Sequence, residues 1–434
     1  MFTSVLISGI TLAVMIMAIL FFPKLHIGKI RLSTYWIVSF AGAIALLVTG
    51  QARLSTVLTA LTADNAINPI KILILFISMT VLSIYLDELG FFRYLANVTL
   101  KQSGCSQYKL FFDLYAIVSL LTVFTSNDII ILSFTPFICY FAKNARISPI
   151  PYLAAEFVAA NTWSMLLIIG NPTNIYIATA YDIGFIEYAG TMVLPTLLAG
   201  LTAFVALFFL FRKRLVEPIS GAPENILIND RVKLTIGIAH LVTCTVALAI
   251  SSYLPGVEMW VISLGAVVSL FICTGLSNLF RHSASTELGR CLLRAPWELI
   301  PFIISMFVII VVLSEKGVTG QIASFLGQDA SIWRYGVASF FSANVVNNIP
   351  MSVLFCRVME SLSKETVRNA AYATIVGSNL GALFTPVGAL AGIMWSSILN
   401  EHKLKFGYLD FLKIGVTVAI PALAAALLML FILF

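Results

Sequence analysis

The sequence predicts an all-α polytopic membrane protein built from two inverted repeats. Three observations predict this class: the excess of apolar residues, the recurrence of long apolar stretches, and a set of marks that appears twice in the same order. Of the 434 residues, 60% are hydrophobic and only 11% are charged. Soluble domains carry about 25% charged residues, so most of this chain must lie in lipid.

Eight apolar stretches have close to the length of about 20 residues that a membrane-spanning helix needs. They cover residues 3–22, 33–50, 69–86, 190–211, 234–252, 257–280, 297–313 and 411–434. The first lacks the basic flank and cleavage site of a signal peptide, so we expect a helix of the mature protein. The net charge of +6 comes mostly from short loops, where it indicates orientation in the membrane rather than nucleic-acid binding.

Four marks recur in the same order in the two halves of the chain. They are Ser78-Met79 with Glu88 and Gly90 against Ser305-Met306 with Glu315 and Gly317; Asn127-Asp128 against Asn347-Asn348; Asn161 with Gly170 against Asn379 with Gly388; and segment 184–188 against segment 407–411. Spacings within the first and third marks are the same in both copies. One match could arise by chance among apolar helices, but four in order predict a duplication.

The charges that flank the paired stretches predict that the repeats are inverted. Stretch 69–86 follows the acidic Asp64 and leads to the basic segment 93–109, so its end faces the cytoplasm. Its counterpart 297–313 follows the basic segment 281–294 and ends beside acidic residues, so it runs outward. We expect both chain termini outside the cytoplasm.

Each repeat is expected to hold four full spans, a hairpin and a long interrupted helix. Each hairpin limb has only about 16 residues, which favours a re-entrant hairpin over two crossings. About ten transmembrane helices, two of them broken, and two re-entrant hairpins result. The predicted boundaries are 1–214 for the first repeat, with hairpin 108–143 and broken helix 149–180; 215–231 for a cytoplasmic linker; and 232–434 for the second repeat, with hairpin 332–363 and broken helix 366–400.

Hairpin tips and helix breaks at bilayer depth mark a cavity, because lipid cannot satisfy non-helical backbone. Broken helices also offer N–H groups and positive dipole ends to an anion near the membrane midplane. Isolated Ser and Thr residues there also suit ordinary helix packing, whereas paired Asn residues beside breaks favour ligand binding. The predicted substrate ligands are Asn127, Asn161, Thr162, Asn171, Thr173, Asn174, Asn347, Asn348, Ser378, Asn379 and Thr385.

One carboxylate lies at a hairpin tip, Asp128, because its counterpart is Asn348. An acid inside a membrane is a candidate for function, here as a proton or sodium carrier. Hydroxyl groups and freed carbonyls coordinate cations, so the predicted ion-coupling set also holds Ser126, Gly170, Gly377 and Gly388. Glu156 either titrates or is a satisfied residue that faces a loop, and the sequence leaves both open.

Motifs of enzymes are absent from the sequence: it has no HExxH, no GxSxG and no P-loop. We therefore expect no enzymatic activity and no cofactor other than a coupling ion, H⁺ or Na⁺. An ATP-driven pump would need a partner subunit.

Several segments carry a resemblance to a known family. They are Leu86-Asp-Glu-Leu-Gly-Phe-Phe92, Asn127-Asp128 with Thr135-Pro136, Arg294-Ala-Pro-Trp297, Asn347-Asn348-Ile-Pro350, Gly377-x-x-Leu-Gly381 and Thr385-Pro386-Val-Gly388. In these the chain resembles the ion transporter superfamily, most closely the arsenite pump membrane proteins. Segment 170–174, Gly-Asn-Pro-Thr-Asn, is similar to the asparagine-rich signature of divalent-anion and citrate relatives.

The resemblance implies paired hairpins, a site between the repeats, secondary coupling to protons or sodium and, in the dicarboxylate branch, dimers with an elevator motion. It leaves a homodimer and an ATPase subunit open as partners. Arsenite pumps carry aspartates where this chain has Asn161 and Asn379. Their loss leaves Asp128 as the main proton candidate and favours a sodium site of neutral oxygens.

We therefore expect a secondary active transporter of a small oxyanion or oxyacid, of the arsenite or antimonite pump type, in the plasma (inner) membrane. The alternative is a sodium-coupled di- or tricarboxylate transporter of the citrate or succinate kind. The sequence leaves open the substrate, the coupling ion and the direction of transport.

Overall fold

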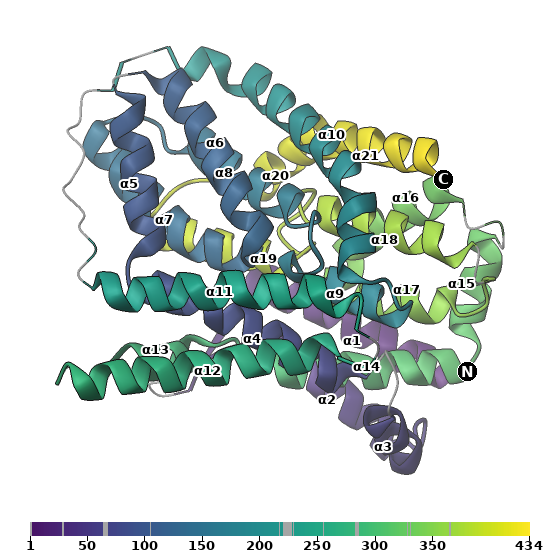
Figure 1. Ribbon diagram of the computed structural model, residues 1–434. Coiled ribbons are helices and arrows are strands. Elements are labelled where there is room, and N and C mark those ends of the chain that lie inside the picture. The colour runs from purple at the N-terminus through teal and green to yellow at the C-terminus, as the bar shows by residue number, and fades with distance from the viewer. Residues whose placement is uncertain are drawn as a thin grey trace.

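The computed structural model describes most of the chain, and its described part is almost entirely helical (Figure 1). The described residues are 2–27, 30–63, 68–104, 106–216, 218–219, 228, 230–254, 256–282, 286–327, 329, 331–363 and 366–434. Asp64 and most of the predicted linker 215–231 lie outside them.

The first half of the described chain runs from α1 to the turn η2. Its helices are α1 (Phe2–Phe21), α2 (Thr34–Val48), α3 (Leu54–Thr62), α4 (Pro69–Glu88), α5 (Phe91–Ser103), α6 (Gln107–Phe124), α7 (Asn127–Ala145), α8 (Ile150–Trp163), the 3₁₀ turn η1 (Ile168–Gly170), α9 (Pro172–Ala180), α10 (Phe185–Phe211) and the 3₁₀ turn η2 (Arg212–Arg214).

The second half runs from α11 to α21. Its helices are α11 (Arg231–Ser251), α12 (Met259–Phe280), α13 (Thr286–Arg294), α14 (Leu299–Glu315), α15 (Val318–Leu326), α16 (Ile332–Val346), α17 (Asn348–Met359), α18 (Val367–Gly381), α19 (Leu390–Glu401), α20 (Tyr408–Ile414), the π-helical turn η3 (Gly415–Ala419) and α21 (Ile420–Leu433).

The two halves have the same order of elements. Each gives two apolar helices, a nine-residue helix, a long helix, a short helix, a helix pair around a tip, an interrupted helix and a closing span. Gly90 joins α4 to α5 with φ 78°, and Gly317 joins α14 to α15 with the same φ, a conformation that suits glycine. The order matches the paired sequence marks, whereas the inversion of the halves across the membrane stays a prediction.

Some features of the structure differ from the sequence prediction. The short helices α3, α5, α13 and α15 and an antiparallel strand pair, β1 (Lys24–Ile27) and β2 (Ile30–Ser33), were not predicted. The limbs α6 and α7 have 18 and 19 residues, so the expected length of about 16 was wrong for the first hairpin. The reason is that its tip occupies only residues 125–126, which leaves nearly all of the segment helical. The re-entrant placement of both hairpins stays a prediction.

The interruptions expected within 149–180 and 366–400 lie at residues 164–171 and 382–389. The local sequence explains the first. Pro172 opens α9 at a position where its missing N–H costs no hydrogen bond. The Asn171 side chain caps the same helix by accepting from the Thr173 N–H at 3.2 Å.

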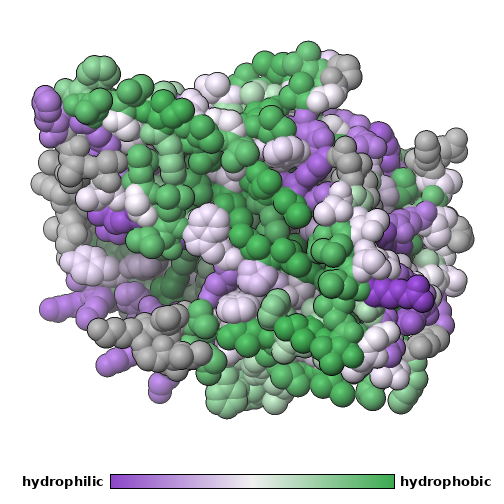
Figure 2. Space-filling model, turned by 90° about the horizontal axis from the view of Figure 1, so that it is seen from below, coloured by the Kyte–Doolittle hydropathy of each residue, from purple (hydrophilic) through white to green (hydrophobic). Residues whose placement is uncertain are grey.

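Among the described residues, eight helical segments are long and apolar enough to cross a membrane. Seven coincide with predicted stretches and the other is α6, which was expected to be a hairpin limb; the predicted stretch 33–50 is α2, with 15 residues. Figure 2 shows hydrophobic residues across the middle of one face, with hydrophilic residues gathered toward its left and right edges. This distribution suits a protein surrounded by lipid.

The halves exchange packing partners around two central helices. α4 of the first half packs against α11, α12 and α13 of the second, and α14 of the second packs against α1 and α2 of the first. In Figure 1 this layer lies below the hairpins and broken helices, and α10 and α21 pack along each other above them. The breaks of the two interrupted helices therefore lie between two layers of long helices.

Glycine permits a close contact between two helices of the second half. A methyl group on Gly377 would overlap the Ser339 side chain and the Gly336 carbonyl, so α16 and α18 approach backbone to backbone, as membrane helices with small residues do.

We predict that Gly377→Ala lowers the stability by about 2 kcal/mol, measured as a lower melting temperature of the purified protein in detergent. Gly265→Ala is the control, because nothing lies within 4 Å of its added methyl group. A Gly377→Ala protein as stable as wild type would show that this approach is loose.

Candidate functional site

The first hairpin tip is attached to the broken helix of its own half. Asn127, the first residue of α7, donates from Nδ2 to Asn161 Oδ1 at 3.1 Å, and its own Oδ1 accepts from the Asp128 N–H at 3.0 Å. Asn161 in turn donates to the Phe157 carbonyl at 2.8 Å. Both asparagines are buried, so a hydrogen bond between amide groups fixes the tip of the first hairpin to α8.

The second tip is attached in the same manner to its own break. Asn347, between α16 and α17, has φ 72°, which asparagine tolerates better than most residues. Its Nδ2 donates to the Val387 carbonyl at 3.0 Å, and its Oδ1 accepts from the Ile349 N–H at 3.3 Å. The Asn348 N–H donates to the Gly388 carbonyl at 3.0 Å.

A second contact holds this tip. Thr385, in the break, donates to Asn344 Oδ1 at 2.6 Å, and Asn344 donates to the Gly381 carbonyl at 3.0 Å. Gly388 lies under the same side chain, since a methyl group on it would come 2.9 Å from Asn344 Oδ1. The predicted residues Thr385 and Gly388 are therefore part of this junction.

Asn379 joins the two broken helices to each other. Its Oδ1 accepts from Ser164 Oγ and from Asn171 Nδ2, each at 3.1 Å. Its Nδ2 donates to Asn174 Oδ1 at 2.7 Å and to the Ile375 carbonyl at 2.9 Å. Two acceptor and two donor positions are thus all used at full burial, and an aspartate could not make the two donated bonds.

The remaining break residues of the first half satisfy backbone groups. Asn174 donates from Nδ2 to the carbonyls of Ser164 at 2.8 Å and Leu167 at 3.2 Å. Asn171 also accepts from the Thr173 hydroxyl at 3.2 Å. Gly170 has no room for a side chain, because a methyl group would overlap the Ser164 carbonyl.

Four buried polar atoms at this site have no hydrogen-bond partner among the described residues. They are Ser126 Oγ, Thr162 Oγ1, Asn348 Oδ1 and Ser378 Oγ. Each residue is next in sequence to a networked asparagine, and each comes from a different one of the four predicted elements. Unpaired buried polar atoms are rare in folded proteins, so each of the four has a hydrogen-bonding capacity that the described residues leave unused.

Asp128 differs from its neighbours in exposure and in contacts. Its side chain is only half-buried, and in the described part of the chain no donor bonds its carboxylate. It lies in the first turn of α7, where the helix dipole stabilises a negative charge. No group of three or more His, Cys, Asp or Glu residues that could hold a metal ion occurs among the described residues.

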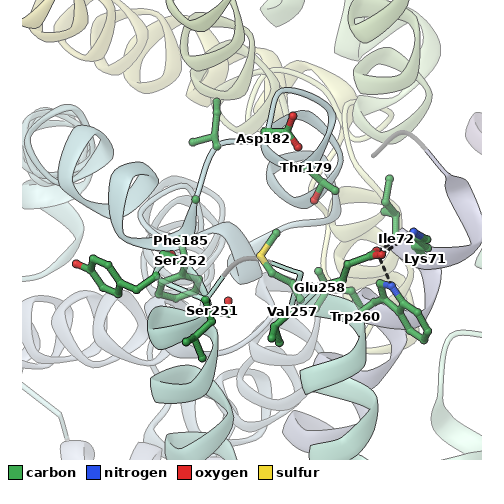
Figure 3. Close-up of a pocket in the computed structure, with 16 residues that line it drawn as sticks. Lys71, Ile72, Thr179, Asp182, Phe185, Ser251, Ser252, Val257, Glu258 and Trp260 are labelled. Atoms are coloured by element: carbon green, nitrogen blue, oxygen red, sulfur yellow. Dashed lines mark hydrogen bonds and ion pairs between the residues drawn. The ribbon is translucent and has the colours of Figure 1, made fainter. Parts of the chain in front are cut away.

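A cavity away from this network lies at the far end of α9 (Figure 3). It has a volume of about 650 Å³ and contains none of the sequence-predicted site residues. On one side of it Glu258 accepts from Lys71 Nζ at 2.9 Å and from Trp260 Nε1 at 2.8 Å. Asn174 of the network and Thr179 of the cavity lining are five residues apart on α9, about 7.5 Å along the helix axis.

Ion pairs at the end of α4 bring two of the motif segments together. Arg294 bonds Asp87 Oδ2 at 2.7 Å and also pairs with Glu88, which contacts Arg290 at 2.6 Å. Asp87 Oδ1 accepts from Ser133 of α7 at 2.6 Å. The sequence showed these segments as separate motifs, and only the fold reveals that they link α4 and α13 to the first hairpin.

Known proteins resemble this chain over most of its length. A family model described as "Citrate transporter", CitMHS, matches residues 16–362. The chain belongs to the CitMHS family. The arsenical pump membrane protein of Escherichia coli is 26% identical to this CitMHS protein over 381 residues, which cover 81% of this chain and 84% of that protein. A putative arsenical pump membrane protein of Bacillus subtilis is 24% identical over 366 residues, covering 77% and 80%.

The fold also resembles that of a solved transporter. The YdaH transporter of Alcanivorax borkumensis aligns with 99% of this chain and 97% of its own, with a TM-score of 0.56 and 13% identity. The predicted recognition and the all-α polytopic membrane fold class are thereby confirmed, whereas the inverted repeats and the re-entrant hairpins stay predictions. This CitMHS protein is a multi-pass transporter of the inner membrane.

The two hydrogen bonds that the Asn379 amide donates lead to a prediction about stability. Asn379→Asp would place a carboxylate oxygen against the acceptors Asn174 Oδ1 and the Ile375 carbonyl, and an unpaired buried charge is costly. We expect a lower melting temperature in detergent, by the equivalent of about 2 kcal/mol or more. The loss should grow as the pH rises, because the unfolded aspartate then ionises freely while the buried one cannot.

Asn400→Asp is the control for this variant, since Asn400 is exposed near the end of α19. It should leave the melting temperature unchanged. An Asn379→Asp protein with wild-type stability at alkaline pH would contradict the assignment of both donated hydrogen bonds.

Proposed function

We propose that this CitMHS protein is an ion-coupled secondary transporter of a small oxyanion or oxyacid of the arsenite or antimonite type. The observation that carries this proposal is the set of four buried, unpartnered polar atoms at Ser126, Thr162, Asn348 and Ser378. Three hydroxyl groups and one amide oxygen suit the hydroxyl and oxygen atoms of an oxyacid, since hydroxyls both donate and accept.

The electrostatics of the site support a small, weakly charged ligand. No Lys or Arg contributes to the described asparagine network, whereas α7, α9 and α17 all begin in it. Helix N-termini offer partial positive charge to an anion without a full cation. Similarity to the arsenical pump membrane proteins over 81% of the chain supports the same substrate class.

A sodium-coupled carrier of di- or tricarboxylates such as citrate is the second candidate. The match of the "Citrate transporter" model to residues 16–362 supports it. A multiply charged carboxylate would need more compensation than helix ends and neutral side chains give, so this function requires bound sodium beside the substrate.

The coupling ion of the proposed cycle is H⁺ or Na⁺, with Asp128 at the first tip as one candidate carrier. Ser126 and the carbonyl of Gly170, in the first break, are the remaining candidate ligands. Of the other predicted glycines, Gly377 lies inside α18, and the Gly388 carbonyl already accepts from the Asn348 N–H. A homodimer and an ATPase subunit are both compatible with this function.

Ligand-dependent thermal stability tests the substrate class. We expect arsenite or antimonite to raise the melting temperature of the purified protein without sodium, because a ligand that binds only the folded state adds about 2.7 kcal/mol at a hundredfold excess over its Kd. Stabilisation by citrate or succinate, and only with sodium, would overturn the oxyacid proposal in favour of the carboxylate carrier.

Variants of the two tip asparagines test whether the ligand binds at the tips. Asn127→Ala and Asn347→Ala should each abolish the stabilisation by ligand, because each releases a hairpin tip. Asn400→Ala, at an exposed position, is the matched control and should keep it. Full retention of ligand stabilisation in both tip variants would contradict a central site.

A further inference from the structure

Glu156 is a fully buried carboxyl group in the middle of α8. Asp87 and Glu156 are the two buried carboxylates among the described residues. Asp87 is paired with Arg294, whereas no Lys, Arg or His of the described chain lies within ion-pair distance of Glu156. The sequence left open whether this residue titrates or faces a loop, and its complete burial excludes the loop position.

Two polar groups from other helices face this carboxyl. The Thr135 hydroxyl on α7 donates to Oε1 at 2.8 Å and to Oε2 at 3.0 Å. The Trp395 indole on α19 faces the same carboxyl, and its buried N–H has no hydrogen-bond partner among the described residues. The Thr135 hydroxyl thus bonds the carboxyl, and the Trp395 N–H is a second donor that lies beside it.

An aromatic cluster fixes the indole in this position. The Trp395 ring lies 4.9 Å from Phe157, 5.0 Å from Phe406 and 5.3 Å from Phe411, measured between ring centroids. Phe157 follows Glu156 in sequence and packs on Phe411 at 5.4 Å. These ring contacts hold the Trp395 indole in place beside the carboxyl.

This environment has an electrostatic consequence. A buried carboxylate without a counter-charge costs several kcal/mol, so the neutral, protonated form is favoured. Cys139, also on α7, is a titratable side chain near the carboxyl, and a thiol carries no compensating positive charge. When Glu156 releases its proton, the Thr135 O–H and the Trp395 N–H are the donors that stabilise the ion.

Glu156 lies on the same two helices that carry the first tip contact. It precedes Asn161 on α8 by five residues, about 7.5 Å along the axis, and Thr135 follows Asn127 on α7 by eight residues, about 12 Å. The carboxyl therefore bonds α7 to α8 below the point where Asn127 bonds Asn161. A change in the protonation of Glu156 would therefore affect the contact between Asn127 and Asn161, which holds the hairpin tip. Through Trp395 it would also affect α19 of the second half.

We propose that Glu156 is the proton-binding site of this transporter, protonated at rest and releasing its proton when substrate binds, with Thr135 and Trp395 stabilising the carboxylate. This inference rests on the proposed transport function and assigns its coupling ion to H⁺. The step is a simple dissociation, in which the O–H bond of the carboxylic acid breaks and the proton passes to water. This proposal assigns the coupling to Glu156 in place of Asp128, the candidate carrier expected from the sequence.

Infrared spectroscopy of the purified full-length protein tests the protonation without any substrate. Wild type should give a carboxylic acid C=O band that disappears in a single titration as the pH rises. The band should be missing in Glu156→Gln and retained in the matched variant Asp128→Asn. Thr135→Val and Trp395→Phe should each move the titration upward by about one pH unit, since each removes a donor to the charged form.

Proton release on ligand binding tests the role in coupling. With arsenite as the probe and a pH-indicator dye as the readout, wild type and Asp128→Asn should release a proton on binding. Glu156→Gln should bind without release, with retained melting-temperature stabilisation as proof of binding and folding. Absence of the C=O band in wild type, its persistence in Glu156→Gln, or loss of proton release in Asp128→Asn alone would each overturn the assignment. A failure of arsenite to bind would contradict the proposed substrate, whereas the infrared titration would still decide the protonation of Glu156.

Discussion

A helix that stops inside a membrane exposes backbone N–H and C=O groups where no water can bond them. The rest of this structure depends on how those groups are satisfied, and asparagine is the main answer. Asn174 bonds the carbonyls of Ser164 and Leu167, Asn171 caps α9, and Asn347 caps α17 while it bonds Val387. The same amide groups then connect one break to another.

The hydrogen bonds divide the polar residues of the site into two kinds. The asparagines of the network are occupied with each other and with backbone, so they determine where the tips and breaks lie. The free bonding capacity belongs to their sequence neighbours Ser126, Thr162, Asn348 and Ser378. A substrate that enters would therefore meet unpaired hydroxyls and one amide first, and it would compete with amide bonds only if the tips move.

The fold class and the places of the breaks could be predicted from the sequence, because apolar length, Gly and Pro act locally. Asn127, Asn161 and Asn379 could be singled out by repetition. Their partners could not, since the bond between Asn379 and Asn174 joins residues 205 positions apart. The contact of Glu156 with Trp395 is equally remote. The limb lengths of the first hairpin were misjudged because the extent of its tip depends on how Asn127 bonds the turn to Asn161 of α8.

The central claim is that Asn379 couples the two broken helices into one site. A double-mutant cycle on Asn379→Ala and Asn174→Ala, with the stability of the purified protein measured for all four variants, tests it most directly. Residues in one hydrogen-bond network give interaction energies of about 0.5–3 kcal/mol, so the double variant should be distinctly more stable than the sum of the single losses predicts. Strictly additive losses would contradict the account, because the two asparagines would then act independently.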